Sequence, residues 1–127
     1  HDFSTLLTIA VSVLFFWGLG IEILADEQLK QFKQDAKSHQ VCQIGLWKYS
    51  RHPNYFGEII IWISFAMGSH HLGGWISPIG LFLIMRFITG PLTEETSIAH
   101  KGQNYLDYQK ATPMIWPYKL FSFKRNK

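Results

Sequence analysis

The part of the sequence with the greatest chemical capacity is residues 51–58, which read Arg-His-Pro-Asn-Tyr-Phe-Gly-Glu and lead straight into an apolar segment. Arg51 and His52 offer hydrogen-bond donors to an anion, and Asn54 can both donate and accept. Tyr55 adds an aromatic face beside them. Ionisable groups at the mouth of a membrane helix mark a functional site by default, so this run is the first candidate for ligand binding.

Two further residues complete this run. Gly57 lets a ligand or another helix approach the backbone closely. A carboxylate at Glu58 would cost a few kcal/mol if it faced lipid, so we expect it to accept from a cofactor or to orient Arg51, His52 or Tyr55. The alternative is an interfacial anchor whose basic and aromatic side chains lie among lipid headgroups. We favour binding, because an anchor has no need of the amide and carboxyl groups.

A second set of polar residues lies at the end of the first apolar stretch. Glu22, Asp26 and Lys33 are spaced i, i+4 and i+11, which places them along one face of a helix that leaves the membrane. Such a face can hydrogen-bond ribose or amide groups and pair with a phosphate. The alternative is a solvated helix end in which Lys33 balances two carboxylates.

A third set, near the C-terminus, combines carboxylate and phenol groups at Glu95, Gly102, Tyr105 and Tyr108. A surface helix that packs its aromatic residues on the membrane would show the same pattern. Together, three separated stretches deliver polar groups to one membrane-level side, which predicts a cofactor pocket open to the cytoplasm. The residues predicted to bind the cofactor are Glu22, Asp26, Lys33, Tyr49, Arg51, His52, Asn54, Tyr55, Gly57, Glu58, Glu95, Tyr105 and Tyr108.

The elements that must position these groups are apolar helices. The chain has 127 residues, of which 47% are hydrophobic and 16% aromatic, which is rich for a soluble domain of this size. Between Leu6 and Ala25 the only charge is Glu22, and about 20 residues at roughly 1.5 Å each span a hydrocarbon core of about 30 Å. The chain opens without Met, and we expect it to be the later part of a longer protein.

Three apolar segments predict three crossings, at about residues 5–25, 56–67 and 75–89. Eleven of the twelve Lys and Arg residues lie between the first two segments or after the third, and the positive-inside rule then places the loop of residues 27–55 and the C-terminal tail in the cytoplasm. Helical spacing continues from Leu24 to about Ala36. After Pro91, Thr93 is expected to cap a helix that runs to about Ala111.

Other classes of site find little support. The single cysteine, Cys42, excludes an internal disulfide and a cysteine metal cluster. The six histidines are scattered and form no ligand set, so we predict no metal. The basic charge is explained by the positive-inside bias, and nucleic acid is not an expected partner.

These residues resemble the C-terminal domain of the steroid 5-alpha-reductase family, most closely its uncharacterised bacterial membrane relatives. The related isoprenylcysteine carboxyl methyltransferase family shares the architecture. The resemblance is carried by Glu22-x-x-x-Asp26 with Gln28 and Lys33, by residues 45–58 with Trp62, by residues 89–95, by Gly102-x-x-Tyr105-x-x-Tyr108, and by Pro113 and Pro117.

The resemblance implies an all-α integral membrane domain spanning residues 1–127, with about three transmembrane helices and a cytoplasmic amphipathic helix. It implies the cofactor-binding half of a bacterial inner-membrane reductase, in which NADPH reduces a carbon–carbon double bond of a lipid-like substrate amid membrane lipids. Asp26, Asn54 and Glu58 match family cofactor-site residues, and Tyr108 falls in the terminal tyrosine motif. Lys33 stands where the steroid enzymes have Arg, and Glu22 replaces their Asn.

The family's substrate-polarising residues lie in earlier helices, so no catalytic residue is assigned in this chain. A second reading is a methyltransferase that uses S-adenosylmethionine, because residues 51–53, Tyr55, Gly57 and the pair Glu94 and Glu95 also look like that family's site. A third is a membrane domain without catalysis. Asn54 followed by Glu58 after the glycine favours the reductase.

Overall fold

The computed structural model describes residues 2–37 and 39–118, and within those ranges the chain forms helices and loops without strands. The all-helical prediction is therefore confirmed. In chain order the elements are α1 (Asp2–Asp35), the 3-10 turn η1 (Gly45–Lys48), α2 (Pro53–Ser69), the 3-10 turn η2 (Leu72–Trp75), α3 (Ile76–Ile84), the π turn η3 (Met85–Thr89), α4 (Gly90–Lys101) and α5 (Gln103–Ala111).

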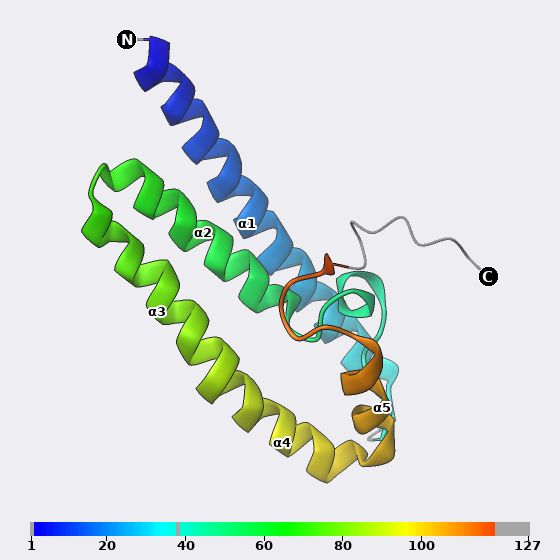
Figure 1. The fold of residues 1–127 in the computed structure, drawn as a ribbon. Helices are drawn as coiled ribbons and strands as arrows, with labels where there is room; N and C mark the ends of the chain where they lie inside the picture. Colours follow the sequence, from blue (N-terminus) through cyan, green and yellow to red (C-terminus); the bar gives the residue numbers. More distant parts are fainter. Residues whose placement is uncertain (1, 38, 119–127) are drawn as a thin grey trace, which may run out of the picture.

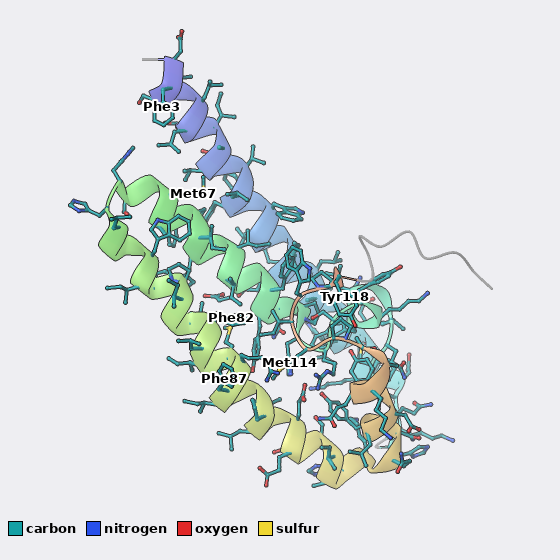
Figure 2. All side chains as sticks on the ribbon, viewed as in Figure 1. Phe3, Met67, Phe82, Phe87, Met114 and Tyr118 are labelled. Atoms are coloured by element: carbon teal, nitrogen blue, oxygen red, sulfur yellow. The ribbon has the colours of Figure 1, made fainter. Side chains whose placement is uncertain are left out.

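Two helical stretches are long and apolar enough to cross a membrane: Asp2–Asp35, and Leu72–Lys101, which joins η2, α3, η3 and α4. Figure 1 shows the second as one rod from α3 into α4, with α2 running between it and α1. Only 6% of the apolar window in each stretch is buried, unlike the core helix of a soluble protein. Phe82 and Phe87 on the rod, and Phe3 at the far end of α1, are exposed (Figure 2).

The middle helix is shorter. Helix α2 has 17 residues, or about 25 Å at roughly 1.5 Å per residue, which falls short of a hydrocarbon core of about 30 Å. Two helices that can span are thus established, and the third crossing stays a prediction. The helix begins at Pro53, whose fixed φ and missing N–H suit a first helical position.

Helices α1 and α2 pack closely because each has a glycine at the crossing. A Cβ atom built on Gly57 would lie 2.7 Å from the Gly18 carbonyl oxygen and 2.8 Å from the Glu22 backbone nitrogen. A Cβ atom on Gly18 would lie 2.8 Å from the Gly57 carbonyl oxygen. The sequence allowed Gly57 either a ligand or a helix as its close neighbour, and the structure places a helix there.

The predicted helix start at Thr93 is wrong. The rod continues through η3 into α4, and the Thr93 hydroxyl donates to the carbonyl of Thr89 one turn earlier instead of capping. Pro91 is tolerated inside this rod since the wide π turn at Met85–Thr89 lies directly before it. Gly102, with φ +57°, then ends α4, a break that the sequence reading placed inside one helix.

Beyond Gly102, α5 folds back toward the end of α1 (Figure 1). The corner is tied to the loop after α1: Lys101 Nζ donates to the Gln40 carbonyl at 2.7 Å, and Asn104 Nδ2 to the His39 carbonyl at 3.0 Å. This return brings the ends of α1 and α4 to either side of one space.

The chain after α5 closes the fold beneath α2. Met114 and Ile115 form a buried cluster with Phe56 and Ile60 of α2, and Figure 2 shows Met114 beside the lower part of that helix. The backbone N–H of Arg51 donates to the Pro113 carbonyl at 2.9 Å, and that of His52 to the Met114 carbonyl at 3.0 Å. The segment 51–58 is therefore anchored through its backbone.

Candidate functional site

A cavity of about 500 Å³ lies between the end of α1, the loop leading to α2, α4 and α5. Its volume falls in the range of small-molecule and cofactor sites. The lining residues are Leu29, Phe32, Lys33, Ala36, Lys37, Val41, Cys42, Trp47, Arg51, His52, Asn54, Tyr55, Thr93, Thr96, Ser97, His100, Lys101, Tyr105 and Tyr108.

Seven of the residues predicted from the sequence to bind a cofactor meet at this cavity: Lys33, Arg51, His52, Asn54, Tyr55, Tyr105 and Tyr108. They come from α1, from the loop leading into α2 and the first turn of α2, and from α5, which are far apart in the chain. The return of α5 toward α1 is what brings them together.

One wall of the cavity is basic and hydroxylated. Lys33 from α1, Lys37 just after that helix and His100 from α4 are exposed on it, and Thr96 and Ser97 lie beside His100 on the same helix. Ammonium and hydroxyl groups are hydrogen-bond donors, so this wall favours phosphate or another anion.

The deep wall is held by a buried carboxylate that the sequence analysis named only for the alternative methyltransferase site and left out of the predicted NADPH site. Glu94 is 4% exposed; its Oε1 forms an ion pair with Arg51 Nη1 and accepts from Gln109 Nε2 at 2.9 Å. Its Oε2 lies 2.6 Å from His52 Nε2. Helical spacing was the sequence signal that could have placed Glu94 at the site. Glu94 precedes the lining residues Ser97 and Lys101 by three and seven residues, so all three lie on one helical face.

The start of α2 contributes an aromatic pair and an unmatched acceptor. The rings of His52 and Tyr55 stack at 4.6 Å between centroids and 9° between planes. The Oδ1 atom of Asn54 is buried, and no hydrogen-bond partner for it exists among the described residues. A buried acceptor without a partner costs free energy unless a ligand supplies the donor, so this residue fits a bound amide or hydroxyl group.

Two tyrosines and the cysteine are fixed as neutral groups. Burial raises the pKa of Tyr105 and of Tyr108 above their ordinary values. The Tyr108 hydroxyl donates to the Trp47 carbonyl at 2.5 Å and lies 3.1 Å from the Ser50 carbonyl. Burial likewise raises the pKa of the Cys42 thiol, which makes that residue a poor nucleophile.

The other six predicted binding residues lie outside this cavity. Asp26 and Glu95 are exposed, Glu22 is half-buried beside Gly57 at the α1–α2 crossing, and Tyr49 borders a second pocket of about 130 Å³.

Glu58, the last of the six, differs from expectation in its partner. Its Oε1 accepts from the Trp62 indole nitrogen at 3.0 Å, one turn along α2, because residues four apart in a helix share a face. The expected role of orienting Arg51 and His52 belongs to Glu94 instead.

The chain is similar in sequence to known proteins. The family described as Protein of unknown function (DUF1295) matches residues 2–112. The chain is 28% identical over 75 residues to bovine 3-oxo-5-alpha-steroid 4-dehydrogenase 1, covering 58% of this chain and 29% of the relative. It is 38% identical over 60 residues to the human type 2 protein, covering 46% and 24%, and 27% identical over 108 residues to the rat type 1 protein, covering 84% and 40%. The chain thus spans well under half the length of these relatives.

Proposed function

Because this chain belongs to the DUF1295 family and is similar to steroid 5-alpha-reductases, we propose that it is the cofactor-binding part of a membrane reductase. In this proposal NADPH binds from the cytoplasmic side and serves to reduce a carbon–carbon double bond in a lipid-like substrate. Residues 1–127 act as one domain of a longer protein.

The observation that carries the proposal is the make-up of the cavity. Basic and hydroxyl groups, among them Lys33 and Ser97, line one wall. The Asn54 side-chain oxygen, which has no hydrogen-bond partner among the described residues, lies at another. A phosphorylated dinucleotide needs both, since its phosphates require cations and its carboxamide requires an acceptor. The names of the relatives, 3-oxo-5-alpha-steroid 4-dehydrogenases, support an oxidoreductase acting on a CH–CH group.

Individual residues then have definite roles. Lys33 and Lys37 bind phosphate, Asn54 accepts from the carboxamide, and Tyr55 provides an aromatic surface for a planar ring. NADPH, when bound, supplies the hydride. The residues of this chain bind and orient it, and the groups that polarise the substrate belong to the rest of the protein.

The membrane setting is part of the same proposal. The two spanning stretches and α2, with the bilayer locally thinned around this shorter helix, give three crossings, with the loop of residues 27–55 and the tail on the cytoplasmic side of a bacterial inner membrane. The cavity lies between that loop, the end of α1 and the α4–α5 corner, so its cofactor is drawn from the cytoplasm. The lipid-like substrate then enters from the bilayer.

Equilibrium binding to the full-length protein in lipid nanodiscs tests the proposal. NADPH should bind saturably, and its affinity should fall as salt screens the lysines. Asn54→Ala should weaken binding roughly tenfold, since a buried hydrogen bond is worth about 1–2 kcal/mol. Lys33→Ala should weaken binding up to about fivefold, while Lys30→Ala, an exposed lysine of α1 outside the cavity, should not.

Two results would overturn it. Saturable binding of S-adenosylmethionine without NADPH binding would select the methyltransferase. Binding of neither molecule by a folded protein would leave a membrane domain without this cofactor chemistry.

A further inference from the structure

Glu94 stands behind the cavity wall and does not border the cavity, whereas two of its partners, Arg51 and His52, do. It comes from α4, 43 residues from Arg51. Its carboxylate pairs with the Arg51 guanidinium, accepts a hydrogen bond from the Gln109 amide and lies within hydrogen-bond distance of the His52 ring, so both carboxylate oxygens are satisfied. A buried charge satisfied this fully holds its partners in one arrangement.

Glu94 connects to the cavity surface through the His52 ring and the Tyr55 ring. His52 Nε2 lies 2.6 Å from Glu94, and the His52 ring stacks in parallel on the Tyr55 ring. Both rings border the cavity. Fixing the rotation of the His52 ring therefore fixes the surface that this stacked pair presents to a bound molecule.

The backbone of this segment is held independently. The Arg51 and His52 N–H groups donate to the carbonyls of Pro113 and Met114, and the Ser50 hydroxyl lies 3.1 Å from the His52 nitrogen. Loss of the Glu94 charge would therefore release side chains before it released the loop. This separates a positioning role from a folding role.

We propose that Glu94 is a positioning residue of the cofactor site, which acts through His52 on the face offered by Tyr55 without touching the cofactor. The inference rests on the proposed function, because it specifies how that site keeps its shape. Positioning of this kind matters since binding groups must be held within about 0.5 Å of their productive arrangement.

A double-mutant cycle on the full-length protein in nanodiscs tests this, with NADPH as the probe. Glu94→Gln should weaken NADPH binding roughly tenfold, within the roughly 2- to 150-fold range of coupling between residues in contact. The matched control Glu27→Gln alters an exposed carboxylate of α1 outside the cavity and should leave affinity unchanged. In a Tyr55→Leu background the effect of Glu94→Gln should shrink below about twofold, because the ring it positions is gone.

A second measurement needs no cofactor. Modification of His52 by diethyl pyrocarbonate, followed by mass spectrometry, should accelerate in Glu94→Gln and not in Glu27→Gln. If Glu94→Gln fails to fold, Glu94→Asp keeps the charge, withdraws it from His52 by one methylene, and should change both readouts in the same direction.

The outcomes separate the two proposals. If the wild-type protein binds NADPH and Glu94→Gln weakens binding equally in both backgrounds, Glu94 contributes only to stability and the positioning role is refuted. If the folded wild-type protein does not bind NADPH, the proposed function fails and this inference fails with it.

Discussion

The crossing of α1 and α2 gives the sharpest test of the packing described above. Gly57→Ala adds a methyl group 2.7 Å from the Gly18 carbonyl oxygen and 2.8 Å from the Glu22 backbone nitrogen. Both neighbours are backbone atoms of a continuous helix, so neither can swing aside. The two helices must separate instead.

The size of the effect follows from that geometry. Restoring an ordinary contact requires a separation of roughly 0.5–1 Å, which costs a quarter to a half of the dispersion energy of each contact along the crossing. Overpacking of this kind costs about 1–3 kcal/mol. We therefore expect the melting temperature of Gly57→Ala to fall by several degrees.

Gly20→Ala is the matched control on α1. A Cβ atom at Gly20 meets nothing within 4 Å, so only the helix propensity changes, and alanine is favoured by about 0.5–1 kcal/mol. Its melting temperature should stay unchanged or rise slightly. Thermal unfolding of both variants in nanodiscs, monitored by circular dichroism at the helix band, measures the difference.

A particular result would refute the reasoning. If Gly57→Ala melts like the wild-type protein but binds NADPH more weakly, then Gly57 makes room for a ligand and not for α1. If both variants melt alike, the close crossing of the helices is wrong.

Three further expectations concern the cavity and the topology. Tyr108→Phe removes the hydroxyl donor to two buried carbonyls and should cost about 1–3 kcal/mol of unfolding free energy. Because burial raises the pKa of Tyr108, the stability contributed by the neutral hydroxyl should persist below about pH 10 and be lost as pH rises further. In denaturant titrations at high pH, the wild-type protein should therefore lose more stability than the variant. Cys42, a buried thiol with a raised pKa that borders the cavity, should react slowly with N-ethylmaleimide, and NADPH should slow the reaction further; acceleration by NADPH would contradict its place in the cavity wall. Single cysteines at Lys37 and Lys110, in a Cys42→Ser background, should be labelled from the same side of the membrane and one at His71 from the other; labelling of all three from one side would exclude three crossings.

Local pattern was enough to predict the helices and part of the site. The apolar run up to Ala25 and its helical continuation predicted α1, and the apolar segment of residues 56–67 predicted most of α2, which starts three residues earlier at Pro53. The positions of Arg51 and Asn54 next to that start were sufficient to bring them to one cavity, because residues at a helix entrance share a location whatever the rest of the chain does.

The remainder depended on contacts between distant residues. The pairing of Glu94 with Arg51 spans 43 positions and follows from the return of α5, which no local spacing encodes. Thr93 and Pro91 together read as a helix start, and only the π turn before them allows the helix to continue. Glu58 was predicted to belong to the cofactor site, although its hydrogen-bond partner is Trp62, one helical turn away.

Residues Met85–Thr89 give the long rod a spare residue. A regular α-helix rotates by about 100° per residue, so deleting Leu83 from α3 would turn everything after it and carry Glu94 away from Arg51. A π turn holds one residue more than the α turn it replaces. When one residue is deleted, the π turn can tighten into a regular α turn. Deletion of Ile88 should therefore leave Glu94 facing Arg51, so that the rod tolerates a change in chain length at this turn and at few other places.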